Sequence, residues 1–153
     1  MIVSKGTLHW IREADEVVAG IARALKPGGR FVAEFGGKGN IANLLAALER
    51  ALTQMGASSD GANPWYCPSI GEYSGVLEKH GLEVREAALF ERPTKLADGE
   101  QGLANWIVMF GDYFCHRVPE RERAVYIGHV ENAARPTLWN HWELDYRRLR
   151  IAA

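Results

Sequence analysis

The chain has 153 residues, of which 47% are hydrophobic and 24% are charged, so it has the composition of a globular protein and the length of one domain with a buried core. Its 18 basic and 19 acidic residues give a formal net charge of -1, which excludes a general attraction to nucleic acid or to an anionic membrane. Two cysteines are too few for a disulfide framework and no run of about 18 apolar residues is present to span a bilayer, so we expect a single cytoplasmic domain over residues 1–153.

The first part of the chain predicts a strand, a helix and a second strand. Residues 1–4 open the chain with three apolar side chains and a serine, which predicts a short strand that leads into a loop. From residue 14 to 25 apolar side chains recur at helical spacing, and Pro27 with the two glycines after it ends that helix. Residues 30–35 are an apolar run bounded by glycines, which is typical of a buried strand in a parallel sheet.

A glycine-rich turn at residues 36–39 follows this strand. Asn40 is expected to cap a second helix, which carries an apolar stripe and ends near Gly56. The residues between Gly56 and Pro68 are mostly small, polar or proline, so they predict an irregular surface loop.

The next helix has a clear start signal. Ser69 and Glu72 have the spacing of a capping box, and Gly81 ends the helix that they begin. Residues 82–90 are then expected to form a strand. This order of strands and helices indicates an α/β sheet.

The last third of the chain predicts two helices and a final strand. Apolar residues at helical spacing occupy 103–110, and Pro119 suits the first turn of a helix that reaches about residue 134. From residue 142 apolar and charged side chains alternate, which predicts a strand with one wetter face and is compatible with an antiparallel strand.

Two sequence motifs carry a resemblance to a known family. Leu-Lys-Pro-Gly-Gly-Arg-Phe at 25–31 resembles the segment before the fifth strand of class I S-adenosylmethionine-dependent methyltransferases. Ser-Lys-Gly-Thr-Leu-His-Trp at 4–10 is similar to the end of the family's fourth strand, beside the methyl donor. The two motifs stand at the family's spacing. The helices around residue 106 and from residue 119, with the strand 142–151, resemble the substrate side and last strand of trans-aconitate methyltransferase-like proteins.

The resemblance implies a truncated Rossmann-like methyltransferase fold of the α/β class. It implies a mixed sheet of about four strands with helices on both faces, and residues 90–140 would be a helical insertion on the substrate side. The resemblance covers nearly the whole chain but only the second half of the family. The first half holds the cofactor on a Gly-x-Gly-x-Gly turn, and no such pattern is found before Ile2 or in the turn at 36–39.

The resemblance also implies S-adenosylmethionine as the cofactor and suggests candidate site residues. Ser4, His9 and Trp10 would border the methyl donor and the acceptor. Arg92 is placed to bind an acidic substrate and Trp106 to form a substrate wall; the alternatives are a solvated arginine and a tryptophan in the core. The histidines and cysteines lack metal-ligand spacing, so we expect no metal.

Two functions remain open. The first is part of a methyltransferase for a small carboxylate-bearing molecule, which would be inactive alone because the glycine-rich cofactor motif is absent. Methylating a carboxylate needs positioning of the reactants rather than an acid or a base. The alternative is a noncatalytic methyltransferase remnant that serves as an oligomerisation or interaction module. In both cases the first strand would be an unpaired sheet edge, so we expect a homodimer or a complex with a separately encoded N-terminal half.

Overall fold

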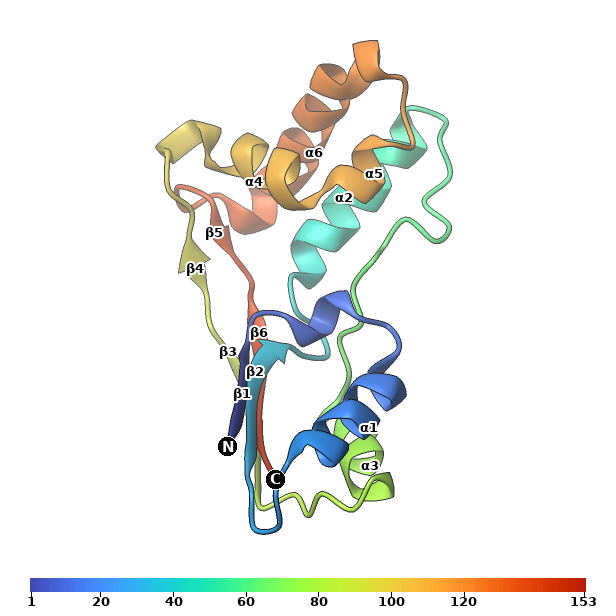
Figure 1. Cartoon of the computed structure of the whole chain (residues 1–153). Coiled ribbons are helices and arrows are strands. Elements are labelled where there is room, and N and C mark those ends of the chain that lie inside the picture. Colours follow the sequence, from blue (N-terminus) through green and yellow to red (C-terminus); the bar gives the residue numbers. More distant parts are fainter. The chain divides into compact units, whose positions relative to one another are not determined.

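The computed structural model describes residues 1–153 and divides them into two compact units (Figure 1). The sheet unit consists of residues 1–40, 65–92 and 146–153. The helical unit consists of residues 41–64 and 93–145. It therefore contains most of the segment expected as a helical insertion, together with an earlier part of the chain. The assignment of the whole chain to a single domain stays a prediction.

The sheet unit is built on four strands in the order β1-β2-β6-β3. β1 (Ile2–Lys5) runs parallel to β2 (Phe31–Gly36), whereas β6 (Arg147–Ala152) is antiparallel to both β2 and β3 (Glu86–Glu91). This confirms a mixed four-stranded sheet with an antiparallel last strand. It also places β1 at one edge of the sheet.

The strand register divides the sheet into a buried face and an open face. Phe35 and Leu89 flank Leu149 on the buried face, and Glu34 and Ala88 flank Arg150 on the open face. Apolar residues thus alternate with charged or small ones, as expected when one face packs on a core and the other meets solvent.

Both long helices of the sheet unit cover the same face. α1 (Ala14–Ala24) buries Val18 and α3 (Ile70–Lys79) buries Leu77 in one apolar cluster with the sheet, and Figure 1 shows the two helices on one side of the strands. The expectation of helices on both faces is wrong for this unit. The physical reason is the charge on the open face, where the ion pair of Glu34 with Arg150 would be costly to cover with an apolar helix.

Two predicted helix ends are confirmed. Leu25 ends α1, and the turn after Pro27 places Gly28 at φ +72°, a conformation that glycine adopts without steric cost. At the start of α3 the Ser69 side chain accepts a hydrogen bond from the Glu72 amide at 3.2 Å, and the Glu72 carboxylate accepts one from the Ser69 amide at 2.7 Å. The capping box is therefore formed in both directions.

The role expected for Asn40 is wrong. α2 (Ala42–Gln54) has Ile41 at its N-cap position with φ 49° and no side-chain cap. The Asn40 side chain instead accepts a hydrogen bond from the Arg147 amide at 2.9 Å. Asn40 therefore ties the turn after β2 to the start of β6.

The final strand also differs from its prediction. Trp142 has φ 53°, so the alternating segment does not begin as a regular strand. β5 (Glu143–Leu144) pairs only with β4 (Thr94–Lys95), and β6 of the main sheet begins later. Trp142 is fully buried and its indole N–H donates to the Glu100 carbonyl at 2.8 Å. Burial of this one large ring takes precedence over strand periodicity here.

The helical unit has its core between α2 and α6 (Arg123–Leu138). Leu48 of α2 and Tyr126 of α6 are fully buried, and the Tyr126 hydroxyl donates to the Leu48 carbonyl at 3.1 Å. Two shorter helices, α4 (Gly102–Phe110) and α5 (Asp112–Cys115), complete the unit together with 3₁₀ turns at Gly99–Gln101 and Glu120–Glu122. None of the helices in the structure is long and apolar enough to cross a membrane.

Candidate functional site

The candidate site lies where the chain leaves β1. Gly6 follows the strand at φ +70° and its amide donates to the Glu34 carbonyl at 2.8 Å, which turns the chain into the 3₁₀ helix Leu8–Trp10. Leu8 enters the apolar core, and His9 is only 8% exposed. The carboxyl ends of parallel strands are where α/β sheets bind ligands, so this is the favoured location for a site in the sheet unit.

A second segment covers His9 and Trp10. The Tyr66 amide donates to the His9 carbonyl at 2.8 Å. The Trp10 ring lies against the His9 ring, with centroids 5.6 Å apart, and meets the Trp65 ring edge-on at the same distance. Trp65 and Tyr66 are therefore held over the 3₁₀ helix by an aromatic contact and a backbone hydrogen bond.

His9 is a buried neutral imidazole. Burial lowers the pKa of His9 to about 4, and the positive charge of Arg148 contributes to the same shift. The Nδ1 atom is buried and has no hydrogen-bond partner. Since buried polar atoms are usually paired, this unused atom marks a position where a ligand group would gain a hydrogen bond.

Arg148 lies on the open face, at the end of the sheet where the chain leaves β2. It pairs in register with Gly36, and a β-carbon at that glycine would lie 3.3 Å from the Cys67 sulfur. The Arg148 guanidinium stacks on the Tyr146 ring at 4.5 Å. Burial raises the pKa of Cys67 to about 11, although Arg148 opposes the shift, so the thiol stays protonated near neutral pH and is not a nucleophile.

The structure brings together two of the three residues expected near the cofactor. His9 and Trp10 are neighbours in the 3₁₀ helix, as described above. Ser4 lies beside Ala33 in the sheet register, and Ala33 belongs to the buried face. Ser4 therefore faces the helical layer of the sheet unit rather than the open face.

The two residues expected at the substrate belong to different units, Arg92 to the sheet unit and Trp106 to the helical unit. Arg92 forms an ion pair with Glu34, and the same carboxylate binds Arg150 at 2.6 Å. Trp106 belongs to α4 in the helical unit, where it is only 5% exposed and packs against Phe110 with ring centroids 5.4 Å apart. This burial is what the alternative interpretation, a tryptophan in the core, predicts, and a role of Trp106 at a substrate stays a prediction.

Sequence reasoning did not identify Arg148, Cys67 and Tyr66 as neighbours of His9. The alternating pattern of the last strand gave no partner for Arg148, because the register between β2 and β6 sets its position. Tyr66 and Cys67 lie in a stretch without periodicity, so their return to the sheet left no signal in the sequence.

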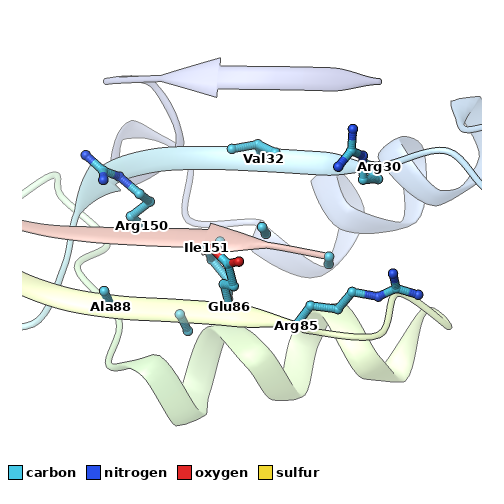
Figure 2. A pocket seen from close by; sticks show the side chains of 10 residues that line it. Arg30, Val32, Arg85, Glu86, Ala88, Arg150 and Ile151 are labelled. Atoms are coloured by element: carbon cyan, nitrogen blue, oxygen red, sulfur yellow. The ribbon is translucent and has the colours of Figure 1, made fainter.

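The open face also carries a hollow of about 890 Å³ (Figure 2). Arg30, directly before β2, and Arg85, directly before β3, lie toward one end of the hollow, and Arg150 lies toward the other. The hollow is therefore centred away from His9, which follows the carboxyl end of β1. The hollow is an exposed surface depression without a buried polar group. The buried polar side chain of the candidate site, His9, lies beyond the carboxyl end of β1. No group of three histidine, cysteine or acidic residues is arranged to hold a metal ion.

The chain is similar in sequence to a protein described as a methyltransferase. No family model matches the chain. It is 32% identical over 171 residues to a Schizosaccharomyces pombe protein described as uncharacterized methyltransferase C70.08c, and the match covers 100% of this chain and 61% of that protein. The chain therefore spans less than two thirds of the length of this relative.

Solved structures show the same fold. The YcgJ protein from Bacillus subtilis matches with a TM-score of 0.53 and 15% identity over 99% of this chain and 61% of that chain. A Bacillus halodurans protein described as a methyltransferase, BH2331, matches with a TM-score of 0.51 and 11% identity over 98% of this chain and 66% of that chain. At these identities the likeness concerns the fold alone.

Proposed function

Since this chain is homologous to part of a methyltransferase and has a Rossmann-like methyltransferase fold, we propose that it is the acceptor-side part of an S-adenosylmethionine-dependent methyltransferase. The proposed acceptor is a small carboxylate-bearing molecule. The observation that carries the proposal is the position of His9 and Trp10, which stand together at the carboxyl end of β1, where an α/β sheet presents its ligands.

The chemistry available at this site suits methyl transfer to a carboxylate. His9 is neutral and Cys67 is protonated near neutral pH, so neither residue provides an ionic catalyst. S-adenosylmethionine, when bound, supplies a sulfonium methyl group, so that a carboxylate oxygen forms the new C–O bond while the S–C bond breaks and no proton moves. Such a reaction depends on the relative positions of donor and acceptor.

In this proposal the residues around His9 contact one side of the cofactor, and the glycine-rich turn that usually holds its nucleotide part is absent from these residues. A β-carbon at Gly37 would lie 2.5 Å from the Leu89 side chain and 2.9 Å from that of Leu149. The glycine at this position therefore serves close packing inside the sheet unit instead of the approach of a nucleotide. We propose that these residues alone bind the methyl donor weakly, because they include no glycine-rich turn.

A titration of the ¹⁵N-labelled chain with S-adenosylmethionine tests this proposal. Weak, millimolar binding should shift the amide resonances of Gly6, His9 and Trp10, while those of the distant β3 residue Ala88 should stay in place. Calorimetry with S-adenosylmethionine or its demethylated product should give no micromolar binding. Micromolar affinity of these residues alone would contradict the need for a glycine-rich turn, and shifts confined to other regions would contradict the site.

A noncatalytic interaction module is the second candidate function. The observation in its favour is the edge strand β1, whose Val3 side chain is 62% exposed on the open face. An exposed apolar edge strand is a template for pairing with another chain. The same titration separates the two functions, because a pure interaction module should leave the resonances of His9 and Trp10 unchanged at millimolar S-adenosylmethionine.

A further inference from the structure

The arginines on the open face differ in whether their charge is neutralised. Arg92 and Arg150 both bind Glu34. Arg148 is half-buried, and no carboxylate lies within ion-pairing distance of it. Its guanidinium is held by stacking on Tyr146, 4.5 Å from the ring centroid. Arg148 is therefore an oriented cation without an anionic partner, and a bound anion would gain from its partial desolvation.

A second unused polar group belongs to the same end of the sheet. His9 is only 8% exposed, and its Nδ1 atom has no hydrogen-bond partner. The two residues are linked through the loop that covers the site. The Tyr66 amide binds the His9 carbonyl, and the next residue, Cys67, packs on Gly36, which pairs with Arg148. The charge of Arg148 reaches both the His9 ring and the Cys67 thiol.

The chemistry of the pair favours a carboxylate over other anions. A guanidinium presents two parallel N–H groups that match the two oxygens of a carboxylate. A single arginine beside a neutral imidazole balances one negative charge, whereas a phosphate dianion would leave a charge uncompensated in a partly buried position. Asn40 is 6% exposed and packs against Gly36. It adds an uncharged polar side chain to the surroundings of the site.

We propose that Arg148 and His9 bind one carboxylate of an acidic small molecule and that Arg148 determines the specificity of the acceptor site. Arg148 forms the ion pair, and His9 contributes a hydrogen bond from Nδ1. The assignment of this acid as the methyl acceptor rests on the proposed function. Binding of the carboxylate itself is an equilibrium property of this chain and does not require methyl transfer.

The test is a titration of the ¹⁵N-labelled chain with succinate, with its diamide succinamide and with inorganic phosphate. Succinate should shift the side-chain Nδ1 resonance of His9 and the Arg148 guanidinium resonances, and the uncharged succinamide should not. Phosphate should bind more weakly than succinate. Equal binding of the diamide or of phosphate would overturn the assignment of a carboxylate site.

Matched variants isolate Arg148 from the general positive charge of the face. Arg148→Gln should weaken succinate binding roughly tenfold, whereas Arg150→Gln, on the same strand and face but engaged by Glu34, should leave it unchanged. Arg148→Lys keeps the positive charge but lacks the two parallel N–H groups of a guanidinium, so it should bind succinate with intermediate affinity. The amide spectrum of the core residue Leu149 checks that each variant is folded. Equal losses in the Arg148 and Arg150 variants would overturn the proposal.

The two proposals fail in distinguishable ways. If succinate binds as described but S-adenosylmethionine never perturbs His9 and Trp10, the carboxylate site stands and the methyltransferase function falls. If a reconstituted enzyme methylates an acid and Arg148→Gln leaves the KM for that acid unchanged, the specificity role of Arg148 falls and the function stands.

Discussion

At the scale of single residues, His9 links the site to the stability of the fold. Its imidazole is neutral because burial and Arg148 both disfavour the protonated form. In the unfolded chain the imidazole regains its ordinary pKa of about 6.5. Below that pH the unfolded state therefore binds more protons than the folded state, and folding becomes less favourable as the pH falls.

We expect the free energy of unfolding to fall by up to about 2 kcal/mol between pH 7.5 and pH 5 because of His9. The loss should begin near pH 6.5 and continue until the folded pKa near 4 is reached. Urea unfolding across this range measures the loss, with His9→Gln as the comparison, since the other ionisable groups are common to both proteins and cancel in the difference. Parallel curves for the two proteins would show that the His9 pKa is not depressed by folding.

Gly37→Ala should destabilise the chain by about 1–3 kcal/mol, because the added methyl group overlaps Leu89 and Leu149. Gly75→Ala is the matched control: no atom lies within 4 Å of a β-carbon at that helical position, so alanine should be neutral or stabilising there. Urea unfolding of the two variants measures the difference. A harmless Gly37→Ala would mean that this glycine is free for another use, including ligand approach.

At the scale of the elements, the capping box of α3 is the feature that the sequence predicts most directly. Ser69→Ala removes the acceptor for the Glu72 amide, and we expect a loss of about 1 kcal/mol in the free energy of unfolding. Ser74→Ala, in the middle of the same helix, should cause no loss because alanine has the higher helix propensity. Chemical denaturation of both variants checks the prediction, which would be contradicted by equal effects.

Elements with a local cause could be predicted from the sequence. The two helices of the sheet unit and the strand between Arg30 and Gly36 follow from apolar spacing, proline and glycine, and capping, all of which act within a few residues. Elements set by distant contacts could not. Asn40 looks like a cap, yet its side chain binds the Arg147 amide, which is 107 positions away. Trp142 ends the strand pattern because its ring is buried and its N–H reaches Glu100.

The candidate site shows the same division. His9 and Trp10 are neighbours in the sequence, so the motif around them located one part of the site. Arg148 joins them only through the antiparallel register of β6, which no local pattern encodes. Arg92 illustrates the converse: a cation after a strand looks available in the sequence, but the fold pairs it with Glu34.

At the scale of the whole molecule, the edge of the sheet determines which partners the chain can accept. The Ile2 amide donates to the Arg30 carbonyl and the Gly6 amide donates to the Glu34 carbonyl, so alternate residues of β1 point their N–H groups toward β2. The intervening N–H groups, at Val3 and Lys5, point away from the sheet. They are the donors that an added strand would use.

We therefore propose that the chain self-associates or binds a second polypeptide by strand addition at β1, and Val3→Pro tests this directly. Proline removes an outward donor while leaving the hydrogen bonds of β1 to β2 in place, so the fold should persist and association should weaken. Val3→Thr keeps the donor and a β-branched side chain, and it should associate like the parent chain. Light scattering over a range of protein concentrations measures the mass of each. A parent chain that stays monomeric at every concentration would contradict self-association, and equal association of the proline variant would exclude β1 as the interface.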